Sequence, residues 1–407
     1  MNKQPTVVYF AIVALTLAAV GGWYWANYHF VSHEGGGSDF AVYWNSGRTV
    51  LYDNATPYGQ LASSRSQNTI FGIAGRVGIP PMLLDIPFHI EVFVLPFAFI
   101  QNFKVASAIW MTLLEILMVI TVFICLRFLR WIPNPLIGSA IILYSIFSVH
   151  GLWAVISGNA VIISGLLIAG VLLALREDLD ELAGILLALA TFKFFTVGFV
   201  IFFIILWAAF RRRKRLILPF AMTLVILIAV SFFFFPNWFL PYARAVLANL
   251  KFGEWLSPAK IFQDELPFIG EKLGWILSGF FAIVLLTEWW LAMKKDYPRI
   301  LWTAALTLAI TPLLGLPTYP QNYAVLIIPL IIALSVMSNR WSSSKTIIID
   351  GILVFLFAGL WAIAVIADDA KSALFFPMPL FIILMLYWIR WWAVSQSLDS
   401  MDSLKSK

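Results

Sequence analysis

The sequence predicts an all-α membrane protein that crosses the bilayer about twelve times. Of its 407 residues, 61% are hydrophobic and 12% are charged, and the mean hydropathy is +0.90. Soluble domains are roughly half apolar and about one quarter charged. Apolar stretches long enough to span recur along the whole chain, and twelve spans of about 20 residues would use more than half of it. We therefore expect one integral membrane domain, 1–407, with any chemistry in loops or between helices.

The net charge of +6 does not indicate nucleic-acid binding. The strongest basic run, 211–215, directly follows the apolar segment 196–210, as is typical of the cytoplasmic end of a membrane span. The single cysteine, Cys125, excludes an internal disulfide framework and a multi-thiolate metal site. The expected partners are membrane lipids, and nucleic acid is not among them.

The first apolar segment, 7–25, follows Lys3 and ends in Trp23, Tyr24 and Trp25, so it reads as a retained signal anchor with a cytoplasmic N-terminus. We then expect a large first extracytoplasmic loop, 26–104. The Gly-rich part of this loop would hold His29 and His33. Within the loop, 86–100 contains two prolines and is short, which favours a re-entrant or interfacial piece over a full span.

The next segments set the predicted topology. Residues 182–210 must begin and end in the cytoplasm, which predicts a hairpin of two short helices with Lys193 near the bilayer midplane. A lysine at that depth costs about 2.5–3.5 kcal/mol unless it meets an anion or water. A second extracytoplasmic loop, 236–270, and a cytoplasmic C-terminus follow. The remaining expected spans are 105–126, 136–152, 160–175, 216–235, 271–293, 299–316, 322–337, 346–366 and 373–390.

The first loop carries the leading candidate for chemistry. Three glycines, 35–37, precede Ser38-Asp39-Phe40-Ala41-Val42-Tyr43-Trp44, and Pro57-Tyr58 follow. Glycines allow irregular backbone beside the membrane, and Asp39 can act as a general base where aromatic residues exclude water. The alternative is that Asp39 only caps the helix that follows it.

Several segments, in the same order, resemble glycosyltransferase family 87, the polyprenyl-phosphate-mannose-dependent mannosyltransferases of the GT-C superfamily. The segments are the run from Asp39 to Trp44 with Pro57-Tyr58, Pro80-Pro81 with Leu95-Pro96, Gly158-Asn159, Ala183-Gly184 through Lys193, and the basic run 211–215. The resemblance covers residues 38 to 330. Ile79 stands where the family has tyrosine, and the glutamine of the family's turn is missing before Asn159.

The resemblance implies a GT-C-type fold and an inverting transferase in the plasma membrane with its active site on the extracytoplasmic face. Asp39 would be the general base. The donor would be a polyprenyl-phosphate sugar, most often mannose, and the acceptor a glycan or glycolipid of the cell envelope. The candidates for binding the donor phosphate are Arg48, Lys193, Lys260, Gln321 and Asn322. The candidates for lining the acceptor site are His33, Tyr43, Trp44, Asn159 and Tyr319.

Several of these residues have simpler interpretations. Lys193 could form a buried pair with a carboxylate such as Glu115, Arg48 could be a solvated loop cation, and His33 could sit at the wet interface. Glu288, near a predicted cytoplasmic end, is assigned a topological role. The acid pairs Asp368-Asp369 and Asp264-Glu265 are expected to lie on solvated loops and not to bind a metal.

We therefore expect no metal and no cofactor, because the donor carries a single phosphate and no phosphate-cradling glycine loop is present. Two alternatives to a transferase remain open. A lipid or lipid-linked-sugar transporter could use Lys193 as a midplane site. A catalytically inactive homologue is the other.

Overall fold

The computed structural model describes residues 4–72, 81–341 and 345–395, and gives only the backbone of 4–12, 345 and 395. All of its regular elements in these ranges are helices, as predicted. Contacts divide the chain into two compact units, which we describe separately. Unit 1 comprises Met1–Ile116, Val155–Asn159 and Asn237–Phe252, and unit 2 comprises Leu117–Ala154, Ala160–Pro236 and Gly253–Lys407.

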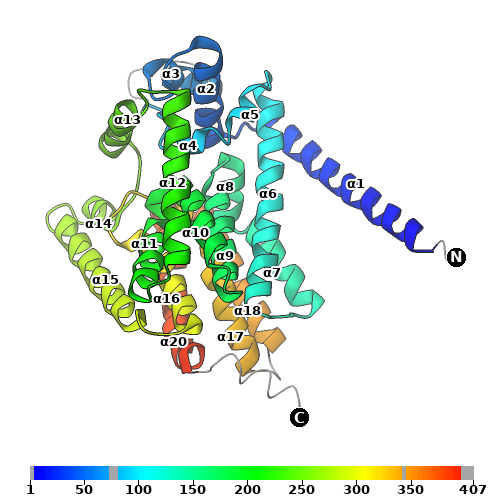
Figure 1. Cartoon of the computed structure of the whole chain (residues 1–407), viewed down its shortest axis with the longest axis vertical. Helices are drawn as coiled ribbons and strands as arrows, with labels where there is room; N and C mark the ends of the chain where they lie inside the picture. The colour runs from blue at the N-terminus through cyan, green and yellow to red at the C-terminus, as the bar shows by residue number, and fades with distance from the viewer. Residues whose placement is uncertain (1–3, 73–80, 342–344, 396–407) are drawn as a thin grey trace. The chain divides into compact units, whose positions relative to one another are not determined.

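Unit 1 is built on a long helix and a group of shorter ones (Figure 1). Helix α1 contacts α6 through Asn27, whose amide donates to Thr112 Oγ1 (3.0 Å) and Glu115 Oε2 (2.8 Å). Helices α2 and α3 pack together, and Arg65 donates to Asp53 across them at 3.0 Å. The helices of unit 1 are α1 (Gln4–His33), α2 (Ser38–Asp53), α3 (Gln60–Phe71), α4 (Phe88–Glu91), α5 (Leu95–Ala98), the first half of α6 (Phe103–Phe128) and α13 (Phe239–Phe252).

Unit 2 holds most of the long apolar helices. Its helices are the second half of α6, α7 (Pro135–Phe147), most of α8 (Val149–Ser157), α9 (Val161–Arg176), α10 (Asp180–Leu189), η1 (Ala190–Lys193), α11 (Phe194–Phe210), α12 (Lys214–Phe234), α14 (Pro258–Glu265), α15 (Gly270–Ala292), α16 (Tyr297–Ile310), η2 (Thr311–Leu313), η3 (Pro320–Leu326), α17 (Ile327–Arg340), α18 (Lys345–Ile366), α19 (Ala370–Ala373) and α20 (Pro377–Ser395).

The chain is a multi-pass membrane protein by helix length and hydropathy. In the described residues seven helices are long and apolar enough to cross a membrane, or up to eight if the bent pair α7 and α8 is one span. The predicted total of about twelve is therefore not reached. Helices α9 and α16 have 16 and 14 residues, which at 1.5 Å per residue is about 21–24 Å, short of a ~30 Å hydrocarbon layer. The predicted anchor, 7–25, lies within α1, but the side chains of 7–12 are outside the described residues.

The segment 182–210 folds back on itself, as the predicted hairpin requires. Residues 180–210 form one apolar stretch of 31 residues, which would be about 46 Å long if it were a straight helix. Arg213, just after α11, nevertheless pairs with Asp180 at the start of α10, with Nη1 and Oδ1 2.9 Å apart. The two ends therefore meet, and the segment turns back at η1, which places Lys193 at the turn.

Close packing of α10 against α12 supports this hairpin. Helices α10 and α12 lie side by side (Figure 1). A Cβ added at Gly184 of α10 would overlap the backbone oxygen of Leu216 and lie 3.0 Å from the backbone nitrogen of Phe220. Only glycine lets the two backbones approach this closely.

The loops of unit 2 gather into two groups, as the predicted alternation of sides requires. In one group, Arg211 contacts the Lys294 carbonyl, Arg213 pairs with Asp180, and Tyr297 donates to the Leu172 carbonyl. We call this group the basic end, because it holds most of the basic side chains of unit 2: Arg176, 211–215, Lys294, Lys295, Arg299, Arg340 and Arg390.

In the other group, Leu256 and Thr318 exchange two backbone hydrogen bonds of 2.8 and 3.1 Å, and Lys371 pairs with Glu254 at 3.5 Å. We call this group the polar-loop end. The separation of the two groups agrees with the predicted parity of the spans, whose cytoplasmic side is a prediction from the positive-inside rule.

The region predicted as the first extracytoplasmic loop is mostly helical. Helix α1 continues to His33, so His29 and His33 lie on a helix and not in the Gly-rich loop as predicted. Their rings stack with centroids 4.2 Å apart, which is the geometry of an i, i+4 pair. The piece 86–100 contains two four-residue helices, in keeping with the prediction that it is not a span.

We expect Gly184→Ala to lower the thermal unfolding midpoint of the detergent-solubilised protein, because the added methyl group must push α10 away from α12. Overpacking of this kind typically costs about 1–3 kcal/mol. Gly279→Ala is the matched control, since Gly279 lies in α15 with nothing within 4 Å of an added Cβ. An equal midpoint for the two variants would show that the close approach at Gly184 is not needed.

Candidate functional site

Asp39 stands on the first turn of α2 and is not its N-cap. The N-cap residue is Gly37, which has a left-handed backbone (φ 72°) and no side chain to cap the helix. Asp39 is half-buried, whereas every residue from Phe40 to Gly47 is buried. The start of a helix favours a negative side chain because the free N–H groups of the first turn carry partial positive charge. The carboxylate therefore lies at the rim of a packed core.

The Gly158-Asn159 turn packs directly on this helix start, so unit 1 brings two of the predicted motifs together. The Gly37 N–H donates to the Ile156 carbonyl at 2.7 Å, and Trp110 Nε1 donates to the Gly158 carbonyl at 2.9 Å. Gly158 has φ +75°, and a Cβ there would lie 2.6 Å from the Phe40 Cβ. Asn159 is 2% exposed, so it belongs to this packed turn.

The aromatic residues after Asp39 form the core of unit 1. Tyr43 and Trp44 are 1% and 7% exposed, and Trp44 Nε1 donates to the Ile100 carbonyl at 3.1 Å. The Arg48 guanidinium lies 4.8 Å from the ring centroids of both Trp44 and Tyr52, and its Nη1 donates to the Ala98 carbonyl at 3.1 Å. Arg48 is thus held by stacking and a hydrogen bond, and it is not a freely solvated loop cation.

His33 lies at the exposed C-terminal end of α1. Its Nδ1 is 2.9 Å from the His29 carbonyl oxygen. A carbonyl oxygen can only accept, so Nδ1 is the donor in this contact. Both readings of His33, an assistant to the base and an interfacial residue, remain predictions.

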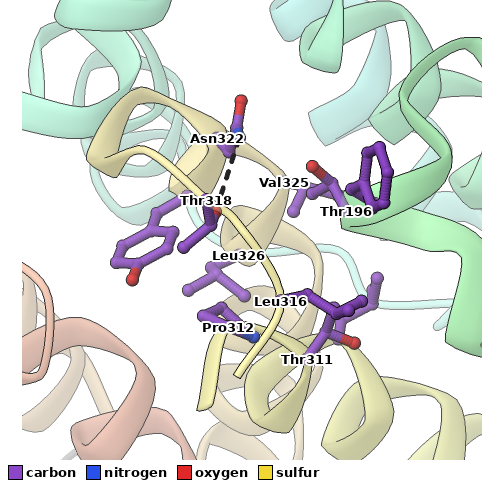
Figure 2. Close-up of a pocket in the computed structure, with 11 residues that line it drawn as sticks. Thr196, Thr311, Pro312, Leu316, Thr318, Asn322, Val325 and Leu326 are labelled. Atoms are coloured by element: carbon purple, nitrogen blue, oxygen red, sulfur yellow. Dashed lines mark hydrogen bonds between the residues drawn. The ribbon is translucent and has the colours of Figure 1, made fainter. Parts of the chain in front are cut away.

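A small cavity lies at the polar-loop end of unit 2, between the start of α11 and the turn that leads into α17 (Figure 2). Its volume is about 10 Å³, enough for about one water. Hydroxyl and amide groups line part of it, and the Asn322 amide donates to Thr318 Oγ1 at 3.4 Å. The polar residues that line it are Thr196, Thr311, Thr318, Asn322 and Tyr323.

The predicted phosphate-binding residues of unit 2 lie on the elements around this cavity. Half-buried Lys193 ends η1, two residues before the cavity wall begins at Phe195, and its N–H donates to Ser164 Oγ at 3.2 Å. Half-buried Tyr319 and Gln321 flank Pro320 at the start of η3.

Lys260 belongs to the same end of unit 2. It follows Leu256, which is joined to Thr318 by backbone hydrogen bonds, and its Nζ lies 5.5 Å from the Trp255 ring centroid. The structure therefore brings all the unit 2 candidates to the polar-loop end.

The alternative that Lys193 pairs with a carboxylate such as Glu115 stays a prediction. Glu115, which is 7% exposed, accepts its hydrogen bond from Asn27 and so has a partner on α1. His150, 2% exposed, packs on Tyr323 with ring centroids 5.2 Å apart.

Glu91 is a feature of unit 1 that the sequence analysis missed. It is fully buried, and neither carboxylate oxygen has a hydrogen-bond partner among the described residues. A Cβ added at Gly47 would lie 3.3 Å from Glu91 Oε1, so the carboxyl group lies against α2. Burial raises the pKa of Glu91 well above its ordinary value of 4.5. The only feature of the sequence that could have indicated this group is the position of Glu91, an acidic residue between Pro87 and Pro96 in the apolar segment 86–100.

His89, two residues earlier, is buried as well, and burial lowers its pKa to about 4. Its ring lies 6.1 Å from that of Trp238, edge to face. Burial therefore favours the neutral form of both side chains.

The arrangement can support acid–base chemistry at the start of α2 and polar recognition at the polar-loop end. A half-buried carboxylate beside a rigid turn can accept a proton from a hydroxyl, and a lysine with nearby hydroxyl and amide groups can bind an anionic oxygen. In the described part of the chain no three His, Cys, Asp or Glu side chains cluster as a metal site would require. A comparison with protein-family models and a search of curated proteins found no match for this sequence.

Gly158→Ala should lower the unfolding midpoint more than Gly72→Ala does. Both glycines have positive φ, so both variants carry the left-handed strain of about 1–2 kcal/mol. Only the Gly158 variant also meets the Phe40 Cβ, since nothing lies within 4 Å of a Cβ at Gly72. Hydrogen exchange of 38–53 should rise in the Gly158 variant alone. Equal effects would show that the turn does not brace α2.

Glu91→Gln should flatten the dependence of unfolding free energy on pH. The unfolded chain loses the Glu91 proton near pH 4.5, whereas the folded protein keeps it to higher pH. Unfolding therefore releases a proton, and stability falls as pH rises above that value by up to about 1.4 kcal/mol per unit. His89 acts in the opposite sense between pH 6.5 and about 4, so the comparison is the difference between wild type and variant. Parallel pH curves for the two proteins would contradict the prediction.

Proposed function

We propose that this protein is an inverting glycosyltransferase that moves a sugar, mannose in the simplest case, from a polyprenyl phosphate to a hydroxyl of a glycan or glycolipid. The observation that carries the proposal is the position of Asp39. It is a half-buried acid on the first turn of a helix whose residues 40–47 are all buried, after three glycines with positive φ. The order of the other segments that resemble glycosyltransferase family 87 supports the same function.

In the proposed reaction Asp39 accepts the proton of the acceptor hydroxyl while that oxygen attacks the anomeric carbon. The new glycosidic bond forms as the bond from the anomeric carbon to the phosphate oxygen breaks, and the electron pair leaves with polyprenyl phosphate. Attack from the opposite face inverts the configuration at the anomeric carbon. The packed turn at Gly158 would hold α2, and thus the carboxylate, in one orientation.

The leaving phosphate gains one negative charge during the transfer, so the site needs a cation or polar donors. Lys193 is the leading candidate, because a lysine at the turn of a membrane hairpin needs an anion or water. Lys260, Gln321 and Asn322 lie at the same end of unit 2 and could contribute donors. Arg48 is a weaker candidate, because stacking on Trp44 and Tyr52 already holds its guanidinium.

The basic end of unit 2 would face the cytoplasm under the positive-inside rule. The polar-loop end of unit 2 would then be extracytoplasmic, on the face where we propose that a lipid-linked donor of a plasma membrane is used.

A lipid-linked-sugar transporter is a second candidate, and the hairpin with Lys193 at its turn is the observation that favours it. A transporter would move the donor lipid across the bilayer without breaking the bond between sugar and phosphate. The two functions differ in whether a new glycoside is formed.

Asp39→Asn should lower the rate of sugar transfer by about 10²–10⁴-fold, because the amide cannot accept the acceptor proton. The measurement uses the purified protein in liposomes, with radiolabelled polyprenyl-phosphate mannose and a panel of other lipid-linked sugars. Donor binding and the unfolding midpoint should stay near wild type.

Asp264→Asn is the matched control, since Asp264 is an exposed acidic residue within the second predicted extracytoplasmic loop, 236–270. It should keep full activity. Wild-type transfer by the Asp39 variant would remove Asp39 as the base. Movement of labelled donor across the bilayer without any glycoside product would favour the transporter.

A further inference from the structure

A buried group of charged side chains joins three helices at the basic end of unit 2. Glu288 of α15 is bound by Arg299 of α16 and by Arg390 of α20, whose Nη2 lies 3.0 Å from Glu288 Oε1. The Tyr387 hydroxyl donates to the same oxygen at 3.2 Å. Glu288 and Arg299 are 5% and 7% exposed. Such a group ties the helices together, but it also carries a charge that must be balanced.

The charges of this group do not cancel. Two guanidinium groups share one carboxylate, which leaves a surplus of one positive charge. Nε of Arg299 is buried and has no hydrogen-bond partner in the described residues. The nearest further acid in sequence, Asp296, is exposed and faces Arg211 at 3.5 Å. A surplus charge on half-exposed Arg390, beside a buried donor that is not used, is costly in a bilayer unless an anion completes it.

The surplus charge lies where a lipid headgroup could reach it. The side chain of Arg390 is 38% exposed, and on α20 it stands between Trp388 and Trp391, which are 59% and 76% exposed. Trp290, two residues after Glu288 on α15, is 74% exposed. Exposed tryptophans on spanning helices mark the headgroup level of a bilayer. The faces of Arg299 and Arg390 also stack on Trp302, which orients both guanidinium groups.

We propose that Arg390 and Arg299, with Glu288 between them, form a binding site for the headgroup phosphate of an anionic phospholipid. The phosphodiester brings the single negative charge that the group lacks, and guanidinium groups bind phosphate oxygens in pairs. The site lies at the end opposite to the polar loops and is independent of the proposed transferase chemistry.

The test measures the unfolding midpoint of the detergent-solubilised full chain with dioleoylphosphatidylglycerol and with dioleoylphosphatidylcholine at equal mole ratio. Phosphatidylglycerol should raise the midpoint more than phosphatidylcholine does. Native mass spectrometry should show one tightly bound phosphatidylglycerol. Arg390→Gln should weaken that binding about tenfold or more, since it removes the surplus charge and leaves Glu288 paired with Arg299.

Lys295→Gln is the matched control, because it removes the same charge from an exposed side chain at the same end. It should keep the preference for phosphatidylglycerol. If Arg390→Gln does not fold, wild type in 1 M NaCl serves instead, and the preference should shrink because salt screens the half-exposed site. An equal response to both lipids, a preference kept in Arg390→Gln or in high salt, or the full shift with inorganic phosphate alone would overturn the proposal.

Discussion

The pairing of Arg213 with Asp180 is the constraint on which the topology of unit 2 depends. An apolar stretch of 31 residues could cross a bilayer once, and the loops on either side would then lie at opposite ends. With the two ends of the stretch in contact, 176–180 and 211–215 share one end, and Lys193 is carried to the turn. The ion pair is half-exposed and contributes little stability by itself. The hairpin is held mainly by close packing of α10 on α12 at Gly184.

The close approach of the Gly158 turn to the start of α2 determines where Asp39 lies. Gly158 touches Phe40, and the N–H of Gly37 reaches the Ile156 carbonyl, so the start of α2 is braced by a turn more than 100 residues away in the chain. The aromatic residues after Asp39 fill the core of unit 1, and Asp39 is left at its rim. Tyr43 and Trp44, which were predicted to line the acceptor site, are buried in this core. Their role is to hold the helix that carries the acid.

The structure shows three different ways to bury a carboxylate. Glu115 accepts a hydrogen bond from Asn27, and Glu288 is bound by two arginines and a tyrosine. Neither carboxylate oxygen of Glu91 has a hydrogen-bond partner among the described residues, and burial raises its pKa. The first joins two helices by a hydrogen bond, the second leaves a positive surplus that calls for an anion, and the third makes folding sensitive to pH. The environment of each acid, and not its residue type, decides what it does.

The sequence by itself determined the class of the protein, because composition and long apolar stretches admit few structures other than membrane helices. It also determined the hairpin, since basic residues on both sides of 182–210 require its ends to share one side. The number of spans could not be predicted, because apolar stretches such as 160–175 and 299–316 do not reveal that their helices are too short to cross. Sequence placed His33 in a loop, whereas α1 continues through it.

Only the tertiary structure could show that Gly158 packs against the start of α2, that Arg48 stacks on two aromatic rings, and that Glu288 forms ion pairs with two arginines. These are contacts between residues far apart in the chain, and they depend on packing distances that no local pattern encodes.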